Sequence, residues 1–64
     1  MENYAKFVVA KEILARAMAI ACTNGFDAND PMIRQLLDDK KELQKFNMAV
    51  VDKIINLYSQ VINL

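Results

Sequence analysis

Few side chains in this 64-residue chain could do chemistry, because the sequence contains no histidine and a single cysteine, Cys22. Without an imidazole, the chain lacks the usual general base for a serine or cysteine nucleophile and the ligands of a His/Cys zinc site. Cys22 falls on the apolar side of a predicted helix with no basic residue beside it, so nothing there would activate its thiol. We expect a small buried side chain rather than a nucleophile.

Two acidic clusters have the residue types of a metal or phosphate site. A calcium loop that begins at Asp27 would place Met32 where the turn needs a glycine, so Asp30 is better explained as a helix cap. Asp38 and Asp39 are adjacent, and adjacent helical residues diverge by about 100°, so both are expected on a solvated face rather than at one ligand. The sequence predicts no catalytic residue, no metal and no cofactor.

The charge of the chain argues against further classes of protein. Eight basic and eight acidic residues cancel and are spread evenly, unlike the basic surface of a nucleic-acid-binding protein. The N-terminal segment does not resemble a signal peptide, and no stretch approaches the roughly 20 apolar residues of a membrane span. One cysteine cannot form a disulfide within the chain, which suits a reducing compartment. We expect a cytoplasmic protein without nucleic-acid or membrane partners.

One segment interrupts an otherwise helix-forming sequence, and it contains the only glycine and the only proline, Gly25 and Pro31. Gly25 can adopt the left-handed conformation that ends a helix, and Pro31 suits the first position of the next helix after an Asp30 cap. The sequence therefore predicts an all-α fold in which helices of about residues 3–23 and 31–63 form an antiparallel two-helix hairpin.

The two predicted helices differ in length. At 1.5 Å per residue they span roughly 31 and 50 Å, so about twelve residues of the second helix would extend beyond the first. This overhang is strongly apolar, and a single domain of residues 1–64 has a marginal core of its own. The sequence therefore predicts self-association as a homodimer that forms an antiparallel four-helix bundle. The predicted self-association interface is made of large side chains: Val51, Ile54, Ile55, Leu57, Tyr58, Val61 and Ile62.

Leucine or valine recurs every seven residues along the second predicted helix, from Leu36 to Leu64, which is typical of a coiled-coil seam. An alternative remains open. A bend near Asn47 would fold residues 48–64 back as a third helix and cover the same apolar side chains. No glycine or proline marks such a bend, so the continuous helix is preferred.

Three protein families resemble parts of this chain. The order of helix, glycine-bearing turn, Asp30-Pro31 and helix is similar to that of small aspartyl-phosphate phosphatases acting on sporulation response regulators. Their Ser-Gln-x-Leu-Asp signature is replaced here by residues 36–40, Leu-Leu-Asp-Asp-Lys. The apolar pattern from Phe46 to Leu57 resembles the tail of type III secretion needle subunits. The size and layout are similar to plasmid copy-number hairpins, which dimerise into four-helix bundles and bind paired RNA loops.

We therefore expect a small non-enzymatic interaction or regulatory protein that acts as a self-associated helical hairpin. The resemblances imply three alternatives: a response-regulator phosphatase-like modulator, a secretion needle-like assembly subunit and an RNA-binding four-helix-bundle hairpin. For a different protein partner, the remaining surface is the polar outer face of the second helix, formed by Arg34, Asp38, Lys41, Glu42 and Lys45. Charged faces of this kind steer encounter and specificity more than they supply affinity.

Overall fold

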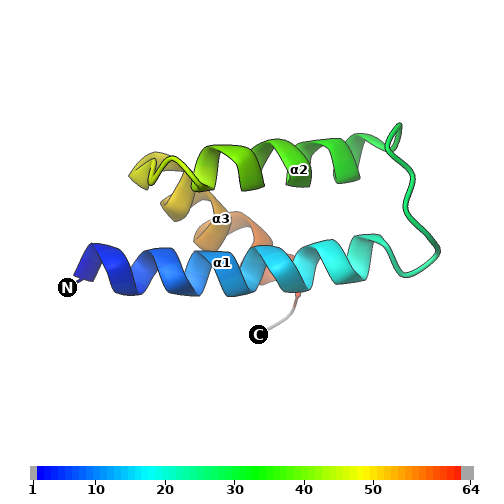
Figure 1. Cartoon of the computed structure of the whole chain (residues 1–64). Helices are drawn as coiled ribbons and strands as arrows, with labels where there is room; N and C mark the ends of the chain where they lie inside the picture. The colour runs from blue at the N-terminus through cyan, green and yellow to red at the C-terminus, as the bar shows by residue number, and fades with distance from the viewer. Residues whose placement is uncertain (1, 63–64) are drawn as a thin grey trace.

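A computed structural model describes residues 2–62, which form three α-helices packed together (Figure 1). Helix α1 is Glu2–Ala21, α2 is Pro31–Leu43 and α3 is Met48–Val61. Helices α1 and α2 lie side by side and antiparallel, and α3 packs against both on one side of the pair (Figure 1). None of these helices combines the length and apolar character needed to cross a lipid bilayer. The chain is all-α, as the sequence predicts.

The turn between α1 and α2 has the backbone chemistry that its residues predict. Gly25 has a φ of 107°, in a region that L-residues with side chains rarely adopt. The Asp30 side chain accepts a hydrogen bond from the Met32 N–H at 2.8 Å, and Pro31 occupies the first position of α2. Asp27 Oδ1 accepts from the backbone N–H two residues later. The structure confirms Asp30 as a helix cap and Asp27 as a turn residue.

The structure corrects the predicted continuous helix of residues 31–63, which is divided into α2 and α3 by a turn that follows Leu43. Phe46 has a left-handed φ of 58°, which is unusual for a bulky residue. Asn47 then caps α3, because its side chain accepts a hydrogen bond from the Ala49 N–H at 3.0 Å. Asparagine thus starts the third helix where the sequence has neither glycine nor proline.

Burial of apolar surface explains why the chain folds back. A left-handed backbone at a residue such as Phe46 costs about 1–3 kcal/mol. The fold-back leaves Val51 and Ile54 with no exposed surface, and burying each such side chain contributes roughly 1.5–3 kcal/mol. These two side chains alone offset the cost of the turn. The apolar overhang expected from a continuous helix is therefore packed within the chain itself.

The core lies where the three helices meet. Ala10 and Ala17 of α1 are buried, and their small side chains let the other helices approach the α1 backbone closely. The rest of this core is formed by larger side chains: Ile13, Leu14, Leu36, Leu43, Val51, Ile54 and Tyr58. Leu64, the last position of the predicted heptad seam, lies outside the described residues.

Candidate functional site

A buried polar cluster joins α2 to α3. The Tyr58 hydroxyl donates a hydrogen bond to Asp39 Oδ2 at 2.5 Å, and the Lys53 ammonium donates to Asp39 Oδ1 at 3.0 Å. Asp39 is 3% exposed and Tyr58 is 1% exposed. The structure therefore corrects the prediction that Asp39 lies on a solvated face, whereas Asp38 is exposed as predicted.

This cluster holds two helices together rather than offering a reactive group. Burial raises the pKa of the Tyr58 hydroxyl well above its usual range, and the hydrogen bond to Asp39 and the negative charge of that carboxylate raise it further. Tyr58 consequently stays neutral and keeps its proton for the hydrogen bond. Both Asp39 oxygens have donors, and burial leaves a substrate no access to either side chain. The arrangement fixes α3 against α2.

The spacing of residues along α2 would have allowed Asp39 to be predicted on the side of the helix that faces the core. It follows Leu36 by three positions and precedes Leu43 by four, which is the spacing of residues on one helix face. Aspartate is almost never buried without a partner, however, and its partner Tyr58 lies 19 residues further along the chain. Only the fold-back of α3 brings the two together.

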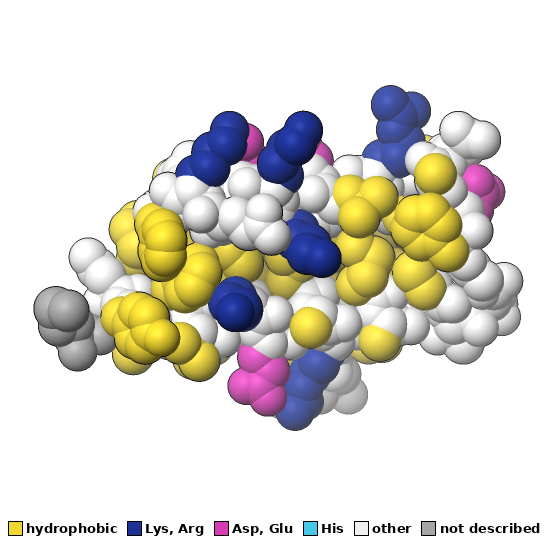
Figure 2. Space-filling view, in the orientation of Figure 1, with side chains coloured by type: hydrophobic (Ala, Val, Ile, Leu, Met, Phe, Trp, Pro, Cys, Tyr) yellow, Lys and Arg dark blue, Asp and Glu magenta, His cyan; other side chains and the backbone are white. Residues whose placement is uncertain are grey.

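An open groove lies between α1 and α2, on the side of this pair that faces away from α3. Its volume is about 440 Å³. It is lined by Phe7, Lys11, Leu14, Ala15 and Met18 from α1 and by Lys40, Leu43 and Gln44 from α2. Figure 2 shows this face, where hydrophobic side chains follow the seam between the two helices with basic side chains among them. The groove is therefore largely apolar, and the charged side chains among its described lining residues are lysines.

Aromatic side chains lie at the end of the groove near the α2–α3 turn. The Phe46 ring stacks on Phe7 with their centroids 4.6 Å apart, and the Tyr4 ring lies 6.5 Å from Phe7. The Lys11 ammonium is 5.9 Å from the centroid of the Phe7 ring, within reach of a cation–π interaction. Phe46 is nevertheless exposed over 62% of its surface. The turn that starts α3 thus also brings an aromatic ring onto α1.

Three residues of the predicted self-association interface are buried inside the chain. Val51, Ile54 and Tyr58 are at most 1% exposed, because α3 folds back onto α1 and α2. Their apolar surface is already covered, so they are not available to a second copy of this fold. The prediction assumed a continuous second helix, which would have left these side chains uncovered.

The other four residues of that interface remain at least partly accessible. Ile55 and Ile62 are half-buried beside the core. Leu57 and Val61 are exposed and lie one turn apart on α3. The exposed apolar surface of the predicted interface is therefore concentrated at Leu57 and Val61.

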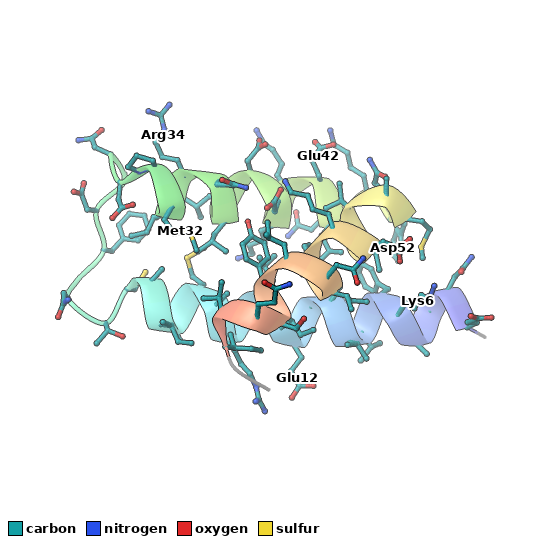
Figure 3. The ribbon with its side chains drawn as sticks, turned by 180° about the vertical axis from the view of Figure 1, so that it is seen from behind. Lys6, Glu12, Met32, Arg34, Glu42 and Asp52 are labelled. Carbon is teal, nitrogen blue, oxygen red and sulfur yellow. The ribbon has the colours of Figure 1, made fainter. Side chains whose placement is uncertain are left out.

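The predicted partner face on α2 lies on the outside of the molecule. Arg34, Asp38, Lys41 and Lys45 are exposed, and Glu42 is half-buried and pairs with Lys45 at 3.1 Å. Figure 3 shows Arg34 and Glu42 on the edge of α2 that points away from α1. None of these five residues lines the groove. The polar face and the groove are thus separate surfaces.

Comparison of this chain with known protein families, with curated proteins and with solved structures finds no match. The family resemblances seen in the sequence gain no support from it. The geometry of the groove is what bears on function.

Proposed function

We propose that this chain is a small non-enzymatic interaction protein that binds a helix of another chain in the groove between α1 and α2. The open apolar groove itself carries the proposal. A domain of this size has a marginal core and gains stability from a partner that covers apolar surface. Laying an amphipathic helix into a hydrophobic groove is a recurrent mode of peptide recognition.

A docked helix would also produce a four-helix arrangement, by a route that differs from the predicted dimer of hairpins. The chain supplies three helices, so one added helix is sufficient. That helix would lie on the opposite side of α1 and α2 from α3, and both faces of the α1–α2 pair would then have an apolar neighbour.

Site-specific photo-crosslinking in cells of the native host tests this proposal. A photoreactive residue in place of Ala15, which lines the groove, is expected to give a discrete cross-linked product. The same residue in place of Ala5, which is exposed on α1 outside the groove, is the matched control and is expected to give none. Equal yields from the two positions would count against the groove as the binding surface.

Self-association is a second candidate, favoured by a different observation. Leu57 and Val61 expose apolar surface on successive turns of α3, away from the groove lining. A second copy of the chain would cover this surface in a homodimer. Sedimentation velocity over a range of micromolar concentrations tests it, and a 7.3 kDa monomer at every concentration would exclude it.

A further inference from the structure

The charged groups that line the groove are basic on both walls. Lys11 of α1 and Lys40 of α2 line it, and the described lining residues include no Asp or Glu. Neither lysine forms an ion pair with a described residue, whereas Lys6, Lys45 and Lys53 each pair with a carboxylate. The groove thus presents two ammonium groups that form no ion pair with a described carboxylate.

The apolar floor of the groove has the length of a short helix. Phe7, Leu14 and Met18 share one side of α1, with Lys11 between Phe7 and Leu14, and extend over about 16 Å at 1.5 Å per residue. Leu43 lines the same groove from α2. A helix of about three turns matches this length. It also satisfies its own backbone hydrogen bonds, whereas an irregular segment would place unpaired polar groups on an apolar floor.

From these features we propose that the groove binds an amphipathic helix of a different protein, with Asp or Glu on both sides of its apolar stripe. The inference rests on the proposed function and adds the chemistry of the partner. The apolar stripe packs on the groove floor, and the flanking carboxylates lie beside Lys11 and Lys40. At one end of the groove, the Phe7–Phe46 stack receives a large apolar side chain of the partner helix as an anchor.

The same charges disfavour a second copy of this chain as the occupant. In a two-fold symmetric dimer through this face, the groove would meet the identical surface of the other copy. The interface would then contain Lys11 and Lys40 of both copies and no lining carboxylate from either described groove, and like charges placed together weaken association. The acidic helix of a different protein is therefore the better match.

Two synthetic helical peptides test the proposal. They share one apolar stripe and one tryptophan, and they differ in having Glu or Lys on the flanks. The chain has no tryptophan, so the fluorescence of the peptide reports binding directly. The Glu-flanked peptide is expected to bind about tenfold more tightly at low salt, with a difference that shrinks as salt is added.

Charge-reversal variants provide the matched controls. Lys11→Glu with Lys40→Glu is expected to reverse the preference between the two peptides. Arg34→Glu with Lys41→Glu makes the same change in net charge on the outer face of α2 and is expected to leave the preference as it is. A reversal by the second pair as well would show that net charge, rather than the groove, selects the peptide.

The remaining outcomes separate this inference from the proposed function. Equal binding of both peptides, abolished by Ala15→Arg, would overturn the acidic partner and leave the groove as a helix-binding site. Binding of neither peptide would overturn both proposals. A dimer that Ala15→Arg dissociates would show that a second copy fills the groove, and would overturn the partner proposed here.

Discussion

The Tyr58 hydroxyl of α3 and the Asp39 carboxylate of α2 form a buried hydrogen bond of 2.5 Å between residues 19 positions apart. A continuous helix of residues 31–63 could not form it, because a separation of 19 residues along one helix is about 28 Å at 1.5 Å per residue. The pair is therefore a direct marker of the three-helix fold.

Tyr58→Phe is expected to lower the free energy of unfolding by about 1–3 kcal/mol, because one oxygen of the buried Asp39 loses its donor. Urea denaturation at neutral pH measures the effect. Tyr4→Phe is the matched control and is expected to change little, since Tyr4 is exposed. A Tyr58→Phe protein as stable as the original chain would show that the two groups are not paired in solution.

The same pair predicts a loss of stability at high pH. Burial, followed by the effects of Asp39, raises the pKa of Tyr58 in the folded chain, whereas the unfolded chain releases this proton near pH 10. The contribution of Tyr58 is thus fully present below about pH 10, and above it the free energy of unfolding falls by up to about 1.4 kcal/mol per pH unit until the folded Tyr58 also ionises.

Tyr58→Phe isolates this contribution, because the two proteins differ in no other ionisable group. Urea denaturation from about pH 8 to about pH 11 should therefore give a shallower decline in the variant. Parallel declines in the two proteins would mean that Tyr58 ionises alike in the folded and unfolded chains.

The turn before α3 is tested by comparing the free energies of unfolding of two variants, Phe46→Gly and Phe46→Ala. Both Phe46→Gly and Phe46→Ala lose the stack on Phe7, so that loss cancels between them. Because φ is 58° at this position, the Gly variant is expected to be more stable than the Ala variant by about 1 kcal/mol. In a continuous helix the order would be reversed by a similar amount, since Gly is the poorer helix former. Thermal or urea unfolding of the two variants decides between these outcomes.

Leu57→Asp tests self-association through α3. Leu57 is exposed, so the variant is expected to fold normally while any dimer weakens, because the interface would bury an unpaired charge. Asn56→Asp adds the same charge at the exposed neighbouring position and serves as the control. Sedimentation velocity measures both variants. A dimer that withstands Leu57→Asp would have to use another surface.

Local signals in the sequence were sufficient for the first half of the fold. Gly25 and Pro31 are unusual residues with narrow backbone preferences, and Asp30 stands where a cap is needed, so α1, the turn and the start of α2 could be predicted. The second break has no such signal. Asn47 is a good cap, but Phe46 disfavours the left-handed turn that precedes it, and burial of α3 residues against the other helices outweighs that preference.

The candidate site was harder to predict than the helices. Its two walls come from α1 and α2, which are far apart in the sequence, and α3 packs on the opposite side of the pair. In the sequence, Lys11 interrupts the apolar stripe of α1, but no pattern indicates that Lys11 and Lys40 line the same groove. The position of Phe46 likewise depends on the turn into α3. These features arise from tertiary packing, which residue periodicity along one helix does not specify.

Mapping by two-dimensional ¹H–¹⁵N NMR tests the central claim, that the groove between α1 and α2 receives a helix, most directly. Addition of the Glu-flanked helical peptide to the ¹⁵N-labelled chain is expected to shift the amide signals of Lys11, Ala15, Lys40 and Gln44, and to leave those of Leu57 and Val61 in place. Shifts confined to Leu57 and Val61, or no shifts at all, would contradict the account.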